Sequence, residues 1–174
     1  SVKMKISDSD KTFYLGAPEY LTDDQALLEK VQGLNRSGLR VVLFCGENSG
    51  KKEPLALIVL EDEIRESVID TIKYFRENDV SVKVISGDSP TTVSAIAKKC
   101  GISGYDRYVS LEGIPDDRIY DMIDDFTIFA RVTPDQKKTL VDALQRKGHK
   151  VCMTGDGIND IVAMQKAEAS VSFK

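Results

Sequence analysis

The second half of this 174-residue chain alternates short apolar strand patterns with helical patterns, and this alternation constrains the fold more than any other feature. Strand patterns cover residues 81–85, 127–129, 150–154 and 169–173, with helical patterns between them. Strands that alternate with helices form parallel sheets, because each crossover returns the chain to the same end of the sheet. The sequence therefore predicts an α/β domain in which helices cover a parallel sheet.

The first part of the chain has a different pattern, beginning with a predicted β-hairpin over residues 2–15. Thr22-Asp23-Asp24-Gln25 has the form of a capping box, and a helix is predicted from there to residue 35. Further strands are predicted at residues 39–45 and 55–60, on either side of a polar loop, 46–53. We therefore expect a smaller α+β lobe and a boundary near Glu53, which divides the chain into residues 1–53 and 54–174.

Two carboxylates follow the predicted strand 150–154 closely. That strand ends at Thr154-Gly155-Asp156, and Gly157 leads to Asn159 and Asp160. Carboxylates four residues apart at a strand end can hold a hard cation such as Mg²⁺, which prefers oxygen ligands. The glycines on either side of Asp156 allow backbone amides to approach an anion closely. By itself, however, a Gly-Asp-Gly sequence is as often an ordinary turn as a site.

A second strand end carries the same chemistry. Ser86-Gly87-Asp88 follows the strand predicted at 81–85, and ligands of parallel sheets bind beyond the carboxyl ends of the strands. Thr133-Pro134-Asp135-Gln136 predicts a capped helix start, and Lys137 lies one turn into that helix. Its ammonium group can neutralise phosphate charge that grows in a transition state. Together these groups predict phosphoryl transfer.

Charge and cysteine content exclude some classes of partner. The net charge is −4 with one histidine, which argues against binding to nucleic acid or to an anionic membrane surface. The three cysteines, Cys45, Cys100 and Cys152, are widely spaced and indicate a reducing compartment. The longest apolar run, residues 55–60, is too short to span a bilayer.

Several motifs together resemble the cytoplasmic headpiece of P-type cation-transporting ATPases, within the haloacid dehalogenase-like superfamily. The matching segments extend over nearly the whole chain, and the last of them is highly specific: residues 15–19, 38–41, Asp62 with Arg65, 86–88, 130–137 and 154–160. The resemblance implies a Rossmannoid phosphorylation domain at 54–174, and residues 1–53 as the C-terminal part of a nucleotide-binding domain. It also implies Mg²⁺ and ATP as cofactors.

The resemblance assigns a role to each candidate residue. Asp156, with Asp160, would hold magnesium, and Asn159 and Asp160 would order the phosphate site. Lys137 would contact the phosphoryl group, while Ser86 and the Gly87 amide would hold its oxygens. The residues expected at the nucleotide, its magnesium and the interdomain hinge are Arg40, Asp62, Arg65, Asp88, Thr154 and Gly155. Apart from the resemblance, Arg40 is equally consistent with a snorkelling strand-edge residue, and Asp62 and Arg65 with a helix-start pair.

Two departures from the family pattern affect function. Leu15 stands where the family usually has lysine beside the adenine, which predicts weak or purely apolar contact there. The family's nucleophile sequence, Asp-Lys-Thr-Gly-Thr, does not occur, and Asp10-Lys11-Thr12 is better explained as a hairpin turn. We therefore expect a fragment that begins inside the nucleotide-binding domain and has no turnover alone.

The absent nucleophile strand would lie between the strands that end at Ser86 and Thr154. Unpaired strand edges are costly, so we expect the gap to be closed by direct pairing, by another segment, or by strand exchange with a second chain. The expected partners are ATP and the rest of the same polypeptide, namely the nucleophile strand, an actuator domain and transmembrane helices. The parent would lie in the cell membrane, with this segment on its cytoplasmic side.

Two other function classes stay open from the sequence. A freestanding phosphatase of the same superfamily would use the same strand ends to cleave a small phosphorylated metabolite. A non-catalytic nucleotide-binding module would keep the fold without the nucleophile. Residues 15–19 and the pair Asp62 and Arg65 favour the ion pump.

Overall fold

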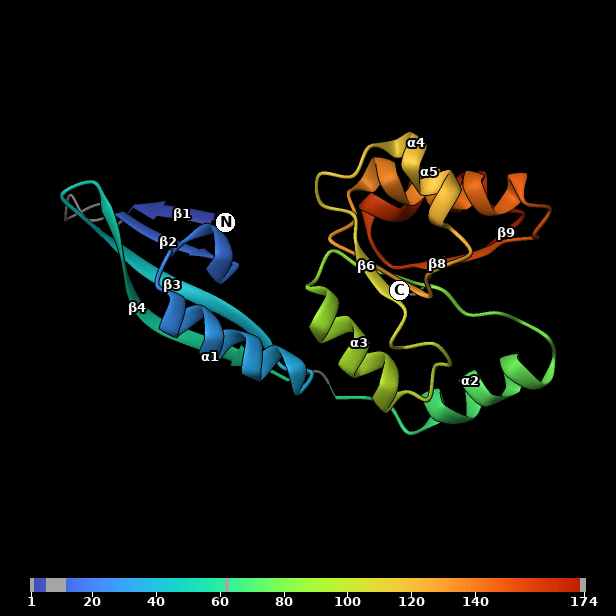
Figure 1. The fold of residues 1–174 in the computed structure, drawn as a ribbon, viewed down its shortest axis with the longest axis horizontal. Coiled ribbons are helices and arrows are strands. Elements are labelled where there is room, and N and C mark those ends of the chain that lie inside the picture. Colours follow the sequence, from blue (N-terminus) through green and yellow to red (C-terminus); the bar gives the residue numbers. More distant parts are fainter. Residues whose placement is uncertain (1, 6–11, 62, 173–174) are drawn as a thin grey trace. The chain divides into compact units, whose positions relative to one another are not determined.

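The computed structural model describes residues 2–5, 12–61 and 63–172, and the chain forms two compact units, Ser1–Glu66 and Ser67–Lys174 (Figure 1). The division falls later than the boundary predicted near Glu53. The reason is strand β4 (Lys51–Leu60), which pairs antiparallel with β3 (Arg40–Asn48) from Leu60 to Lys51. Its ladder hydrogen bonds tie residues 54–60 to the first unit.

The first unit is an antiparallel sheet in the order β1-β2-β3-β4, where β1 is Val2–Lys5 and β2 is Thr12–Gly16. The predicted N-terminal hairpin is confirmed, with Val2 opposite Leu15, although residues 6–11 lie outside the described residues. The loop predicted at 46–53 is wrong. There β3 and β4 meet in a tight turn at Ser49 and Gly50, whose positive φ angles of 51° and 79° suit a twisted hairpin.

One helix, α1 (Gln25–Arg36), packs on one face of this sheet, after a short 3₁₀ turn, η1 (Pro18–Tyr20). Its N-cap is Asp24 rather than Thr22, because the Asp24 carboxylate accepts a hydrogen bond from the Leu27 amide at 3.2 Å. The small core contains fully buried Leu43 and Cys45, which point to the same side of β3.

The second unit alternates helices and strands as the sequence predicts, with one additional strand, β6. In chain order its elements are α2 (Ser67–Glu77), β5 (Val84–Ile85), α3 (Pro90–Lys99), β6 (Tyr108–Ser110), α4 (Asp116–Met122), β7 (Ile128–Ala130), α5 (Pro134–Arg146), β8 (Cys152–Gly155), η2 (Ile158–Asp160), α6 (Ile161–Lys166) and β9 (Ala169–Ser172).

The strands of this unit are parallel, which confirms the predicted α/β class, but they form two sheets. One has the order β5-β7-β6 and the other is the pair β8-β9. In the described part of the chain, β5 and β8 are therefore both edge strands, and the direct pairing that we considered between them is not observed. The two edges belong to the strands that were predicted to flank the absent nucleophile strand.

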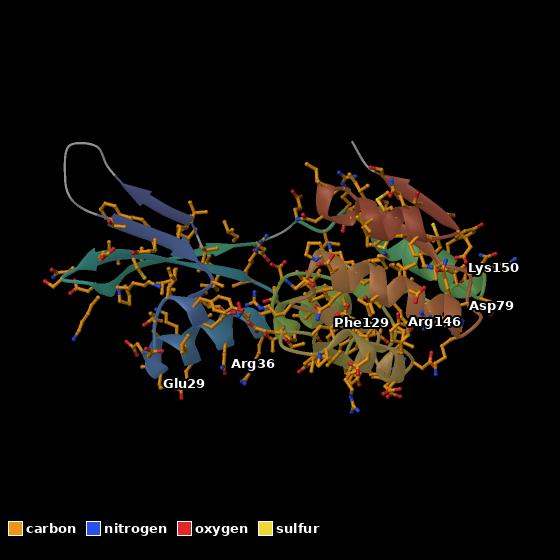
Figure 2. All side chains as sticks on the ribbon, turned by 90° about the horizontal axis from the view of Figure 1, so that it is seen from above. Glu29, Arg36, Asp79, Phe129, Arg146 and Lys150 are labelled. Carbon is orange, nitrogen blue, oxygen red and sulfur yellow. The ribbon has the colours of Figure 1, made fainter. Side chains whose placement is uncertain are left out.

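The main core of the second unit lies around Phe129 on β7, which is fully buried (Figure 2). A second cluster joins Val141 of α5, Met153 of β8 and Ala163 of α6, with Ile85 of β5 against it. Helix α2 differs from the others because none of its residues is buried. Among its apolar side chains, Phe75 is 37% exposed.

Candidate active site

The end of β8 and the 3₁₀ turn η2 bring the predicted carboxylates to one place. Asp156 follows β8 directly and is exposed, as are Thr154 and Asn159. Asp160, at the end of η2, is buried, with 7% of its surface exposed. The two carboxylates therefore have different environments, although they are only four residues apart.

Lys137 of α5 forms a close ion pair with Asp160. The distance from Lys137 Nζ to Asp160 Oδ1 is 2.5 Å, and 16% and 10% of the two side chains are exposed. The other carboxylate oxygen, Oδ2, accepts a hydrogen bond from the Gly157 amide at 3.3 Å. The Lys137 hydrogen bond, with those from the Gly157 and Asp156 amides, lowers the pKa of Asp160 below its ordinary value and keeps it ionised at neutral pH.

Gly155 leaves the space that Asp160 occupies. A Cβ added at Gly155 would lie 2.6 Å from Asp160 Cβ and 2.8 Å from its Oδ2. At Gly157 a Cβ would be 3.5 Å from the same oxygen, which is an ordinary contact. The two glycines of the Gly-Asp-Gly sequence thus differ in purpose, and only the first is required by close packing.

The start of α5 fixes the position of Lys137. The predicted capping box is confirmed: Thr133 Oγ1 accepts from the Gln136 amide at 3.3 Å, and Gln136 Oε1 accepts from the Thr133 amide at 3.1 Å. The Gln136 side chain also donates to the carbonyls of Leu111 and Ile114, so it is anchored at both ends. A cation in the first turn of a helix is repelled by the positive end of the helix dipole, and the negative charge of Asp160 offsets this repulsion.

The loop Ser86-Gly87-Asp88 follows β5, and residues 131–132 hold its carbonyl groups. The Val132 amide donates to Ser86 O at 3.1 Å, the Arg131 side chain to Gly87 O at 3.3 Å, and the Arg131 amide to Asp88 O at 3.2 Å. Within the loop, the Asp88 amide donates to Ser86 Oγ at 3.1 Å.

Arg131 is the residue of this site to which sequence reasoning assigned no role. Its backbone is left-handed, with φ of 52°, which is uncommon for a residue other than glycine. This conformation turns the chain after β7 so that two successive amides meet the loop that follows β5. No signal in the sequence indicates it, because a left-handed arginine has no distinctive pattern of neighbours.

The remaining predicted residues belong to the first unit. Arg40 begins β3, opposite Leu60, and is exposed, as is Arg65, which follows β4. Asp62 lies outside the described residues. Their roles at the nucleotide and the hinge stay predictions.

The fit to a magnesium ion depends on Asp156. Within residues 2–5, 12–61 and 63–172, no group of three or more His, Cys, Asp or Glu side chains could hold a metal. Magnesium often takes only one or two carboxylates, with substrate phosphate and water as its other ligands. The exposed Asp156 fits that pattern. Each oxygen of Asp160 already accepts one hydrogen bond, which leaves lone pairs on both, and its predicted role as a second ligand stays a prediction.

The chain belongs to the family of haloacid dehalogenase-like hydrolases, whose profile matches residues 1–168. Its relatives include P-type cation-transporting ATPases, which confirms the predicted resemblance. It is 38% identical over 169 residues to a probable cation-transporting ATPase, exp7, of Streptococcus pneumoniae, an alignment that covers 92% of this chain and 22% of that protein.

Two further relatives carry more specific names. The calcium-transporting ATPase CtpE of Mycobacterium bovis is 38% identical, with 91% of this chain and 21% of that protein covered. The magnesium-transporting ATPase, P-type 1, of Salmonella typhimurium is 32% identical, with 87% and 18% covered. The chain thus spans about a fifth of the length of these relatives. Within its described part, no helix combines the length and apolar character needed to cross a membrane.

Proposed function

We propose that this chain is part of the ATP-driven headpiece of a P-type cation-transporting ATPase, with the second unit as phosphorylation domain and the first as part of the nucleotide-binding domain. The observation that carries the proposal is the partly buried Lys137–Asp160 pair beside the glycine turn at the carboxyl end of β8. The pair holds the Lys137 ammonium group at the edge where parallel sheets bind ligands.

In the proposed reaction, an aspartate in a polypeptide segment outside this chain attacks the γ-phosphate of ATP and ADP leaves. Water later hydrolyses the resulting aspartyl phosphate, which restores the aspartate and releases inorganic phosphate. That segment would pair with the free edges of β5 and β8. Lys137 would neutralise charge on the transferring phosphoryl group, and Ser86 and the Gly87 amide would bind its oxygens. Magnesium held by Asp156 would supply additional positive charge.

The same proposal places the parent protein in a membrane, with this segment on the cytoplasmic side, and makes the chain inactive without the nucleophile. The names of the relatives include calcium and magnesium transport. We assign no cation to this chain, because the ion would bind in membrane helices rather than at the described site.

The test is calorimetric titration of the chain with inorganic phosphate and with ATP, each in the presence of Mg²⁺. We expect binding of both without turnover, and about tenfold or greater weakening of phosphate binding in Lys137→Met, because a charge-assisted contact is lost. Lys138→Met is the matched control, since Lys138 is the exposed neighbour on the same helix.

Three other outcomes would contradict the proposal. Turnover of sugar phosphates by the chain alone would indicate a freestanding phosphatase. Nucleotide binding that is unchanged in Lys137→Met would favour a non-catalytic module. Absence of phosphate binding at millimolar concentration would contradict the proposed site.

A further inference from the structure

One face of α5 contacts the β8–η2–α6 segment at three levels. Lys137, Val141 and Gln145 are spaced four residues apart and so lie on the same side of the helix. Lys137 pairs with Asp160, and Val141 packs against Met153 and Ala163. Gln145 makes the third contact, eight residues from the candidate site.

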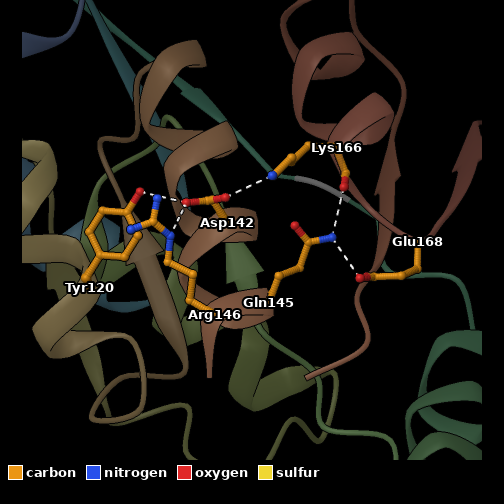
Figure 3. A network of polar contacts seen from close by, with 6 residues as sticks. All are labelled: Tyr120, Asp142, Gln145, Arg146, Lys166 and Glu168. Carbon is orange, nitrogen blue, oxygen red and sulfur yellow. Dashed lines mark hydrogen bonds and ion pairs between the residues drawn. The ribbon is translucent and has the colours of Figure 1, made fainter. Parts of the chain in front are cut away.

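This third contact is a chain of hydrogen bonds (Figure 3). Gln145 Nε2 donates to the Lys166 carbonyl at 2.9 Å and to Glu168 Oε1 at 2.8 Å. The other oxygen of Glu168 accepts from the Val151 amide at 2.8 Å. Glu168 therefore links the C-terminal half of α5 to the residue that immediately precedes β8.

The helix and the strand have nearly the same length between their two tie points. From Lys137 to Gln145, eight residues at 1.5 Å rise span about 12 Å of helix. From Val151 to Gly155, four residues at 3.3 Å span about 13 Å of strand. Both elements are stiff. Fixing Gln145 relative to Val151 therefore also fixes the position of Lys137 along β8, relative to the Gly155–Asp160 turn.

The neighbouring α5 residue Asp142 has contacts on two sides of the helix, because its Oδ1 pairs with Lys166 Nζ of α6 at 2.9 Å. Asp142 Oδ2 accepts from the Tyr120 hydroxyl of α4 at 2.8 Å, which ties α5 sideways to α4. The Tyr120–Asp142 bond involves no residue of β8, β9 or η2. The change Tyr120→Phe removes this bond and leaves the Asp142–Lys166 pair in place, so it is the matched comparison for a bond of similar length and similar position along the same helix.

We propose that Gln145 and Glu168 are positioning residues for the candidate site: they fix the axial position of α5 relative to β8 and so bring Lys137 to Asp160. The relevance of this inference to catalysis rests on the proposed function. The structural coupling between the two ends of α5 does not depend on it.

The test compares nuclear magnetic resonance spectra of the chain with those of Gln145→Ala, Glu168→Gln and Tyr120→Phe. In the first two variants we expect the resonances of the Lys137 ammonium and the Gly157 amide to shift, although neither contacts the changed residue. Exchange of the Gly157 amide hydrogen, which bonds to Asp160, should become about tenfold faster. Gln145→Lys keeps a donor for the same two oxygens, so its Lys137 and Gly157 resonances should match those of the unchanged chain.

The inference is overturned if shifts stay confined to residues near 145, 151 and 168, or if Tyr120→Phe moves the Lys137 and Gly157 resonances equally. Should Gln145→Ala fail to give a folded spectrum, Glu168→Gln decides, because it keeps the side-chain volume. None of these measurements needs a ligand. Their failure would therefore leave the proposed function standing, whereas failure of phosphate binding in the unchanged chain would count against that function only.

Discussion

At the scale of single residues, the site depends on Asp160, whose side chain occupies space that is open because Gly155 has no Cβ. Asp160 Cβ lies 2.6 Å from where a Cβ of residue 155 would be, and from that position the Asp160 carboxylate pairs with Lys137. Buried charge pairs of this kind are costly to break, because the remaining partner is left uncompensated. The first prediction concerns this contact.

Gly155→Ala should displace Asp160 and separate it from Lys137, with a loss of stability of about 1–3 kcal/mol from overpacking. Urea denaturation measures the stability, and the Lys137 ammonium resonance reports the pair. Gly157→Ala is the control, because its new Cβ would meet only ordinary contacts. Equal losses in the two variants would contradict the packing argument.

Asp142 provides a prediction about pH. Hydrogen bonds from Lys166 and then Tyr120 lower the pKa of this carboxyl in the folded chain. The carboxylate therefore stabilises the fold at every pH above the ordinary aspartate pKa of about 3.9, and this contribution is lost as pH falls through the lowered folded value.

Asp142→Asn should accordingly lose stability at neutral pH and should show a weaker decline below pH of about 4 than the unchanged chain. Urea midpoints at a series of acidic pH values would measure both effects. If the two proteins declined in parallel from pH of about 4 downward, Asp142 would not be the group responsible.

At the scale of elements, α5 carries Lys137 and makes contacts along its whole length. Its capping box, its anchored Gln136 and the contacts along one face fix its ends and its rotation. Thr133→Ala should lower the stability by about 1 kcal/mol, while Thr133→Ser should keep most of it. Thermal unfolding of the two variants would test this, and equal melting temperatures would argue against the cap.

A second prediction at this scale concerns thiol reactivity on the edge strand β8. Cys152 on this strand is exposed, whereas Cys45 and Cys100 are buried and burial raises their thiol pKa. A maleimide should therefore modify one thiol quickly in the folded chain and the other two only on unfolding. Cys152→Ser should abolish the fast phase. Should the fast phase persist in that variant, the assigned exposure of β8 would be wrong.

At the scale of the whole molecule, the important feature is that the chain divides after Glu66. Strand β4 completes the first unit, and Leu57 on that strand packs against the cluster of Leu43 and Cys45. A chain shortened to residues 1–53 should therefore unfold at a lower temperature than one of residues 1–66. Circular dichroism would measure this, and coincident melting curves would favour the earlier boundary.

The sequence by itself determined the α/β class, the order of most elements and the helix cap at Thr133, and it predicted Lys137 and the two carboxylates as candidate site residues. These features depend on local periodicity and short-range hydrogen bonds, which a few neighbouring residues specify. The same locality explains the errors: the loop predicted at 46–53 contained polar residues, yet it formed paired strands and a tight turn.

Only the tertiary structure decided which carboxylate pairs with Lys137, how Arg131 holds the loop after β5, and how α5 connects Gln145 to Glu168. It also placed β5 and β8 at the edges of two separate sheets in the described residues. Each of these depends on contacts between segments 20 or more residues apart, whose formation is set by packing of the whole unit rather than by local preference.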